Sequence, residues 1–256
     1  MTPTSADAPL SGLRVAVTRP REQASDLVAS LEAVGAEAVS VPVIEIVDPA
    51  DGGVALASAL GSLRPAEWLV VTSPNGAARV GAALADRPLL DGVRIAAVGP
   101  ATRARLDAAG LSVDLVPDDA IAEGLVAAFP EPPAGGGRVV LARAEVARET
   151  LPEQLRALGW EVDEAAAYRT VASGIDAAER AAAADADAVV FTSGSTVDAL
   201  VRELGAEGLP PLVVSIGPAT TAVATDLGVS VTVEARAHTI PGVVDALVRH
   251  VSGGRE

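Results

Sequence analysis

The sequence contains no cysteine and only two histidines, His238 and His250, both near the last predicted helix. Disulfides, thiolate metal sites and cysteine nucleophiles are therefore excluded, and a zinc site built on histidine is not expected. Lysine is also absent, so all 19 basic residues are arginine. The net charge is -15 and no basic segment occurs, so we expect no nucleic-acid partner.

Long apolar runs are also missing. None approaches the roughly 18–20 residues that a membrane helix requires, so we expect no membrane partner. Residues 1–10 lack a basic segment followed by an apolar core, which predicts no signal peptide and a cytoplasmic protein. The motifs G-x-G-x-x-G after the first strand, G-x-x-x-x-G-K-[ST] and G-x-S-x-G do not occur, which argues against the nucleotide sites and hydrolases that they mark.

The sequence repeats itself, and its 256 residues suit two domains of ordinary size. The segment RVAVTR at 14–19 resembles RVVLAR at 138–143, an offset of 124 residues (138 − 14), and Gly35 matches Gly159 at that offset. LVVTS at 69–73 resembles VVFTS at 189–193, an offset of 120 (192 − 72). VGPAT at 98–102 resembles IGPAT at 216–220, an offset of 118 (217 − 99). Landmarks that keep their order indicate a duplicated unit.

Each repeat alternates short apolar runs with helical periodicity. In the first repeat we predict strands at 14–18, 37–41, 67–72 and 94–98, and helices at 21–34, 54–63, 75–85 and 101–109. Strands that alternate with helices and are apolar almost throughout predict an α/β protein with two similar lobes, each a doubly wound parallel sheet.

Two domain divisions fit this pattern. The segment EPPAGGG at 131–137 is typical of a linker and would divide the chain into contiguous tandem lobes. Alternatively, the extended stretches at 42–47 and 165–171 pair and form a double connection between lobes. The pattern leaves both divisions open, and in either case we expect the ligand to bind in the cleft between the lobes.

The repeated turns follow strands, and in open parallel sheets ligands bind beyond the carboxyl ends of the strands. Such turns present N–H groups and hydroxyls at helix N-termini, which suits anions, and glycine admits a close approach of the ligand. Helix capping is the alternative reading of each single turn. The candidate substrate-binding residues in these turns are Thr72, Ser73, Gly99, Thr102, Thr192, Ser193, Ser195, Gly217 and Thr220.

Three further residues are candidates for chemistry. Arg19 follows the first strand, where a guanidinium can bind a carboxylate through two hydrogen bonds, and Arg143 is its repeat partner. Either arginine is otherwise a solvated surface residue. Tyr168, the only tyrosine, can donate a proton or simply pack its ring. Trp68 and Trp160 begin strands and are expected in the core.

Together these residues resemble the uroporphyrinogen-III synthase family. The resemblance rests on Thr18-Arg19-Pro20 after the first strand, the two Thr-Ser turns, the two Gly-Pro-Ala-Thr turns and Tyr168 before Arg169-Thr170, and runs from about Leu13 to Leu247. It implies a fold with a two-stranded connection and one discontinuous lobe. The implied first lobe is 1–42 plus 172–256, the second is 48–164, and the connecting strands are 43–47 and 165–171.

The resemblance also implies a reaction. Hydroxymethylbilane, a linear tetrapyrrole, is closed to uroporphyrinogen III with loss of water and inversion of ring D, without cofactor or metal. We expect the chain to be a monomer. Tyr168 is implied to assist the departing hydroxyl, and the turns and Arg19 to hold substrate carboxylates. Arg143 is left outside the site. A two-lobe ligand-binding or sensor protein and a regulatory relative without turnover are the alternatives.

Overall fold

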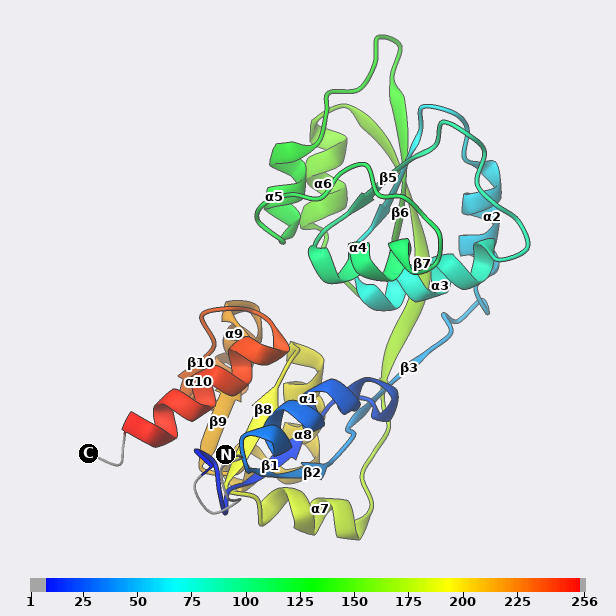
Figure 1. Cartoon of the computed structure of the whole chain (residues 1–256). Helices are drawn as coiled ribbons and strands as arrows, with labels where there is room; N and C mark the ends of the chain where they lie inside the picture. Colours follow the sequence, from blue (N-terminus) through cyan, green and yellow to red (C-terminus); the bar gives the residue numbers. More distant parts are fainter. Residues whose placement is uncertain (1–7, 254–256) are drawn as a thin grey trace. The chain divides into compact units, whose positions relative to one another are not determined.

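The computed structural model of the chain describes residues 8–253. Residues 1–7, part of the segment examined for a signal peptide, lie outside the described residues. Within the described range, no helix is long and apolar enough to cross a membrane. The chain divides into two compact units, which we call unit 1 (residues 8–45 and 171–253) and unit 2 (residues 46–170) (Figure 1).

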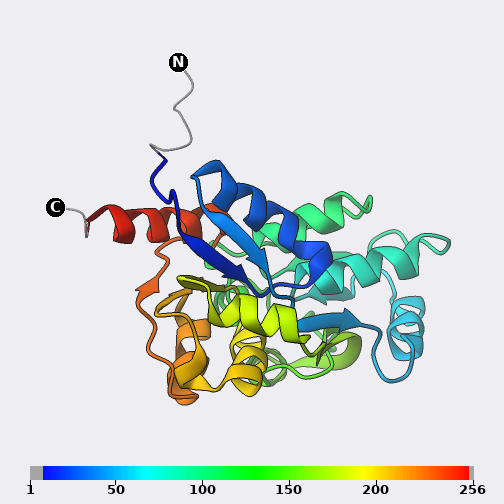
Figure 2. The ribbon, with the colours of Figure 1, turned by 90° about the horizontal axis from the view of Figure 1, so that it is seen from below.

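Unit 1 is built on a five-stranded sheet whose strands pair in parallel in the order β10-β9-β8-β1-β2. Its central strands are apolar on both faces, and helices cover both (Figure 2). One face packs against α1 and α10, and the other against α7, α8 and α9. The bounds are β1 Arg14–Val17, α1 Arg21–Ala33, β2 Glu37–Ser40, α7 Ala177–Ala184, β8 Ala188–Phe191, α8 Gly194–Leu204, β9 Leu212–Ser215, α9 Pro218–Asp226, β10 Val233–Glu234 and α10 Ile240–Gly253.

Unit 2 has a second five-stranded sheet, of order β3-β7-β6-β4-β5. Helices α2, α3 and α4 pack on one face and α5 and α6 on the other (Figure 1). The bounds are β3 Ile44–Val47, α2 Val54–Ser62, β4 Trp68–Val71, α3 Pro74–Leu84, β5 Arg94–Ala97, α4 Pro100–Asp107, α5 Ala122–Ala128, β6 Gly137–Ala144, α6 Thr150–Ala157 and β7 Trp160–Ala172. The predicted α/β class with two parallel sheets is therefore confirmed, and each predicted element of the first repeat is present within a residue or two of its expected bounds.

The chain passes between the units twice, within β3 and within β7, which are neighbours in one sheet. A boundary at the linker 131–137 would separate β6 from β4, to which it is paired along Trp68–Val71. The sequence repeats and the structural units therefore do not coincide. Each unit combines the βαβ segment that opens one repeat with the later strands of the other repeat, and the equivalent strands have the same order in both sheets.

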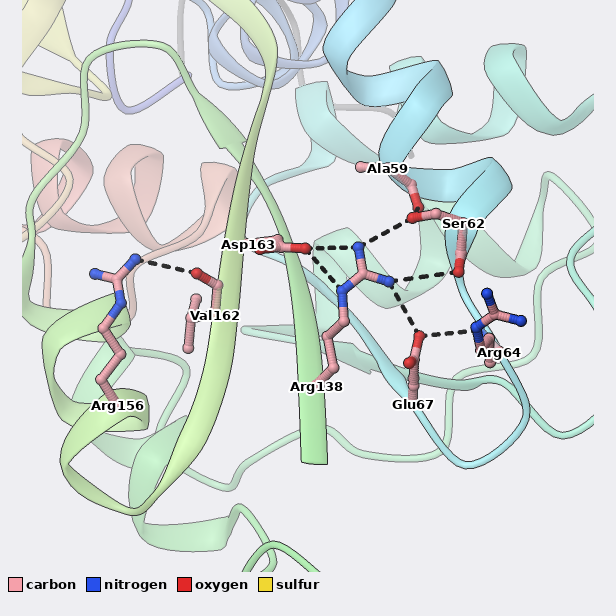
Figure 3. Close-up of polar contacts among 8 residues, drawn as sticks. All are labelled: Ala59, Ser62, Arg64, Glu67, Arg138, Arg156, Val162 and Asp163. Atoms are coloured by element: carbon pink, nitrogen blue, oxygen red, sulfur yellow. Dashed lines mark hydrogen bonds and ion pairs between the residues drawn. The ribbon is translucent and has the colours of Figure 1, made fainter. Parts of the chain in front are cut away.

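At the amino ends of the unit 2 strands, Arg138 joins three elements (Figure 3). Its Nε donates to Asp163 Oδ2 on β7 (2.7 Å), its Nη1 to Glu67 Oε2 before β4 (3.2 Å) and its Nη2 to Ser62 Oγ at the end of α2 (3.0 Å). Partial burial opposes the charged form, but Asp163 and Glu67 outweigh it and raise the pKa of Arg138. Arg138 is thus fully engaged in holding the sheet to α2.

The core of unit 2 contains an aromatic cluster. The ring of Phe129 lies 5.0 Å from that of Trp68 and 5.5 Å from that of Trp160, measured between centroids. Trp160 Nε1 donates to Pro130 O (3.0 Å). Trp68 and Trp160 are each 4% exposed, which confirms that they belong to the core.

Both tryptophans lie in unit 2, so their fluorescence reports the unfolding of that unit. We expect Phe129→Ala to reduce the free energy of unfolding by about 3–5 kcal/mol, the usual cost of removing a buried aromatic ring. Phe191→Ala, the matched change in unit 1, should lower the midpoint of urea unfolding followed by circular dichroism and leave the tryptophan transition in place. Equal shifts of the fluorescence transition in both variants would show that tryptophan fluorescence does not report unit 2 alone.

Candidate functional site

The predicted site residues lie at the carboxyl ends of strands in both units. In unit 2, the Thr72-Ser73 turn follows β4 and the turn at 99–102 follows β5, while Tyr168 lies on β7. In unit 1, Arg19 follows β1, and the turns at 192–195 and 217–220 follow β8 and β9. Because parallel strands all end at the same edge, each sheet has one edge that carries these groups.

Ser73 and Tyr168 form a short chain of hydrogen bonds in unit 2. The backbone N–H of Gly76, in the first turn of α3, donates to Ser73 Oγ (3.1 Å), and Ser73 Oγ donates to Tyr168 Oη (3.0 Å). Ser73 is therefore a helix cap, as the alternative reading of its turn required, and it also contacts the phenol. Since Tyr168 Oη accepts this bond, its own proton is available to another acceptor. The Tyr168 side chain is otherwise buried, with the residue 8% exposed.

The glycines of the two Gly-Pro-Ala-Thr turns have a role that the sequence did not reveal. Both have extended backbones, with φ of -157° at Gly99 and 168° at Gly217, so no left-handed conformation requires glycine. A Cβ on Gly217 would lie 2.7 Å from His238 Cδ2, and a Cβ on Gly99 would lie 3.0 Å from Ala120 Cβ. Because a following loop already occupies this space, we attribute the glycines to internal packing and not to the approach of a ligand.

His238 and Ala120 are the residues that sequence reasoning missed. The His238 side chain was expected on the surface, and the residue is exposed, but its ring also packs on Gly217. The two residues are related by 238 − 120 = 118, the offset that relates Gly217 to Gly99. An alignment of the two repeats that extends beyond the turns would have predicted that His238 and Ala120 occupy equivalent positions.

The hydroxyl groups of the turns differ in exposure. Thr102 and Thr220, the third residues of α4 and α9, are buried, at 3% and 4% exposed. Thr72 and Thr192 are half-buried at the ends of β4 and β8. Ser193 Oγ lies 2.9 Å from Ser195 Oγ and makes no capping hydrogen bond to α8. Ser195 is exposed and Ser193 is half-buried. The N-termini of α4, α8 and α9 add backbone N–H groups to the same edges.

The two repeat-related arginines have different surroundings. Arg143 is 6% exposed and donates to Glu164 Oε2 (2.5 Å), Ala147 O (2.7 Å) and Glu149 Oε1 (2.8 Å). It is a structural residue in unit 2 and not the solvated residue of the alternative reading, which agrees with its exclusion from the predicted site.

Within residues 8–253, Arg19 makes one long hydrogen bond, from Nη2 to Gln23 Oε1 (3.5 Å). Its Nε is buried and has no hydrogen-bond partner among residues 8–253. Burial lowers the pKa of Arg19, although Asp26 acts in the opposite direction. Arg19 is thus a partly desolvated cation whose hydrogen-bonding capacity is largely unused.

No group of three or more acidic, histidine or cysteine side chains suited to a metal ion occurs in the described part of the chain. The available chemistry therefore consists of hydroxyls, helix N-terminal N–H groups, one phenol and one poorly paired guanidinium. Groups of these kinds, on a two-unit α/β protein, suit the binding of a small anionic molecule.

Comparison with known proteins identifies the family. The family model described as uroporphyrinogen-III synthase HemD matches residues 25–245. The uroporphyrinogen-III synthase of Synechococcus elongatus is 32% identical in an alignment that covers 94% of this chain and 97% of that protein. That of Chlorobaculum parvum is 27% identical, with coverages of 85% and 90%. The chain belongs to the uroporphyrinogen-III synthase family, which confirms the resemblance seen in the sequence.

Solved structures show the same fold. A mutant uroporphyrinogen III synthase from the extremely thermophilic bacterium Thermus thermophilus superposes with a TM-score of 0.66 at 19% identity, covering 94% of this chain and all of that one (100%). The enzyme from Helicobacter pylori gives a TM-score of 0.62 at 14% identity, with coverages of 93% and 99%. Members of the family are cofactor-independent enzymes that close a linear tetrapyrrole during heme biosynthesis.

The contrast between the arginines predicts different effects on stability. Arg143→Gln should reduce the free energy of unfolding by roughly 2–3 kcal/mol in urea titrations, less than the 3–5 kcal/mol of a fully buried pair because Glu164 and Glu149 keep 30% and 59% of their side-chain exposure. Arg19→Gln should change it by less than about 1 kcal/mol, since it removes one long hydrogen bond. Equal losses in the two variants would show that Arg19 has stabilising partners.

Proposed function

We propose that this chain is an active uroporphyrinogen-III synthase, which converts hydroxymethylbilane to uroporphyrinogen III. Membership of the family supports this reaction. The roles that we assign to individual residues rest on the hydrogen-bond chain from Gly76 N–H through Ser73 to Tyr168. It presents the only phenol of the sequence with its proton free, at the edge of the sheet where the substrate is expected.

The reaction requires little covalent assistance. Loss of the substrate hydroxyl, which takes one proton and departs as water, gives an electron-rich azafulvenium ion. This cation is attacked by ring D at its substituted position, and the spiro intermediate fragments and closes again with ring D inverted and one proton lost. The linear molecule closes by itself at the unsubstituted position, so the protein must hold it curled in the geometry that favours the other closure. That is catalysis by positioning.

In this scheme Tyr168 donates the proton that the leaving hydroxyl needs. The hydrogen bond from Ser73 stabilises the negative charge that develops on the phenol oxygen as its proton leaves. The N–H of Gly76 lies at the N-terminus of α3, so the positive end of a helix supports the same charge. A fixed donor thus acts at the one step that breaks a carbon–oxygen bond.

The turns would hold the eight substrate carboxylates. We assign direct contact to the accessible hydroxyls of Ser193 and Ser195 and to the N–H groups at the N-termini of α4 and α9. Thr102 and Thr220 are buried, so we assign them the role of holding those N-termini in place for substrate binding. Thr72, Thr192, Gly99 and Gly217 complete the turns, and Arg19 contributes the charge.

The proposal predicts the behaviour of Tyr168→Phe. Turnover of hydroxymethylbilane should fall by about 10²-fold, the low end for general acid catalysis, because the azafulvenium ion forms readily. The enzyme-made product should remain isomer III, since curling of the substrate depends on the turns. Stopped assays with separation of the product isomers measure both quantities.

Ser73→Ala is the companion change. It keeps the phenol but removes its donor, so we expect a smaller fall in turnover, roughly tenfold, together with about 1 kcal/mol of lost helix capping. Wild-type turnover in a folded Tyr168→Phe protein would leave Tyr168 with a packing role. Absence of isomer III from the wild-type reaction would refute the proposed function itself.

A second prediction concerns binding. The double change Thr102→Ala and Thr220→Ala should raise the KM for hydroxymethylbilane about tenfold and should alter kcat less than Tyr168→Phe does. The reason is that it disturbs two carboxylate-binding turns and leaves the Ser73–Tyr168 pair intact. A reduced kcat at unchanged KM would contradict this division of roles.

A further inference from the structure

Five large apolar side chains are exposed among residues 8–253, and all of them belong to unit 2. They are Val54, Leu90, Ile121, Val146 and Leu158. A single exposed apolar residue needs no explanation by itself. Val146, however, has the largest exposed fraction of the five, 90%, and lies two residues beyond the carboxyl end of β6, at the edge of the sheet that carries the candidate site.

The loop that carries Val146 is anchored on both sides of this residue. On one side, the backbone N–H of Glu145 donates to Tyr168 O on β7 (2.8 Å). On the other side, Ala147 O accepts a hydrogen bond from Nη2 of the buried Arg143 (2.7 Å). Because both neighbours are held by the sheet, the Val146 side chain is kept in solvent at a defined position.

A β-bulge brings the candidate proton donor to the start of this loop. Arg143 pairs with Ala166, but the next residue of β6, Ala144, pairs with Tyr168, so Ala167 is an extra residue in β7. Consecutive residues of a regular strand point to opposite faces of a sheet. Here Ala167 and Tyr168 both belong to the apolar core on the face covered by α2, α3 and α4. The bulge therefore turns the phenol towards α3 and sets its backbone beside the end of β6.

The other exposed apolar residues show what distinguishes Val146. Leu90 and Leu158 precede β5 and β7, so they lie towards the amino ends of the strands and away from the candidate site. Of the five residues, Val146 is the one that adjoins a residue hydrogen-bonded to Tyr168 within the described range. Leu90, which is 59% exposed, is thus a matched apolar residue outside the candidate site.

The substrate of the proposed reaction has two kinds of surface. Its carboxylates suit the N–H groups and hydroxyls of the turns, whereas the faces of its pyrrole rings are apolar and gain nothing from such groups. The ring that carries the hydroxymethyl group must lie near Tyr168, because Tyr168 donates to the hydroxyl that leaves. An exposed valine that is already fixed loses little conformational freedom when a ring covers it.

We propose that Val146 packs against the pyrrole ring that carries the hydroxymethyl group and binds that ring beside Tyr168. This inference rests on the proposed function, and it adds a kind of contact, apolar packing on a ring, that the carboxylate-binding turns do not make. The ring stays in place while the carbon–oxygen bond breaks, so the contact is present in both the bound substrate and the transition state. Its loss should therefore raise KM more than it lowers kcat.

Val146→Ser tests the proposal because it removes the apolar contact at a position where the fold does not depend on it. The KM for hydroxymethylbilane should rise about fivefold while kcat stays within about twofold. The unfolding temperature should not change, since the side chain is exposed. Val146→Leu keeps an apolar side chain and should keep the wild-type KM within about twofold. Leu90→Ser, the matched loss at the other edge of the sheet, should leave both constants unchanged.

A binding measurement separates this inference from the proposed function. Uroporphyrin I, a stable macrocycle with four pyrrole rings and eight carboxylates, serves as the probe in fluorescence titrations of the wild type and the three variants. We expect Val146→Ser to bind about fivefold more weakly and the other two variants to bind like the wild type. The ratio of the Kd values of Val146→Ser and the wild type should be the same at about 0.05 M and about 0.5 M salt, because the lost contact carries no charge.

The outcomes are distinct. Unchanged KM and unchanged probe binding in Val146→Ser would overturn the role of Val146, even if the wild type makes isomer III. Equal losses in Val146→Ser and Val146→Leu, or in Val146→Ser and Leu90→Ser, would also overturn it, since an apolar contact at this one position would not be the cause. A wild type that fails to make isomer III would refute the proposed function, whereas selective loss of probe binding in Val146→Ser would still support a ring contact at this loop.

Discussion

Parallel pairing of buried strands is the constraint on which the rest of this structure depends. Strands such as β4 and β8 are buried on both faces, so polar groups are excluded along their length and can appear only where the strands end. Parallel direction then gathers those ends on one edge of each sheet. The hydroxyl turns and Arg19 are found there because the interior of the sheet has no place for them, and Tyr168, within the longer strand β7, lies beside the end of β6.

The duplicated sequence shows how the same backbone can serve different chemistry. Equivalent strands keep the same order in the two sheets, and even the minor bridge between Ala96 and Leu115 corresponds to the pairing of Val214 with Val233 in unit 1, at the offset of 118 (233 − 115). The differences lie in side chains at the strand ends. Glu164 binds Arg143, whereas no carboxylate among residues 8–253 forms an ion pair with Arg19, and Ala120 lies beside Gly99 where His238 lies beside Gly217.

Much of the fold could be predicted from the sequence because it follows from local pattern. Apolar runs such as Trp68–Val71 and amphipathic helices such as α1 are recognised by period, and the carboxyl ends of the strands follow from the parallel class. The three acceptors of Arg143, by contrast, depend on the path of residues 144–149 and on the pairing of β6 with β7, which a local pattern does not give.

The finer features of the candidate site depend on contacts between distant residues. The bond between Ser73 and Tyr168 joins positions 95 residues apart, and the seating of His238 on Gly217 joins a turn to a loop beyond two further elements. The repeated motif singles out Gly99 and Gly217, and the sequence analysis explained them by the approach of a ligand. The sequence does not show that Ala120 and His238, from a later loop, lie against these glycines. The unsatisfied Nε of Arg19 could not be predicted either, because it depends on the absence of an acceptor among the neighbouring residues of the described chain.

The exchange of βαβ segments between repeats also orders events during synthesis. Unit 2 is one continuous stretch, residues 46–170, and all its sheet partners have left the ribosome once β7 is made. Strands β1 and β2 precede unit 2 in the chain, yet β1 pairs with β8, so Val15 meets Ala188 only after 173 further residues (188 − 15) have been added. This βαβ segment is therefore completed only after unit 2 has been translated, and the edge of β1 that later pairs with β8 must remain unpaired until then.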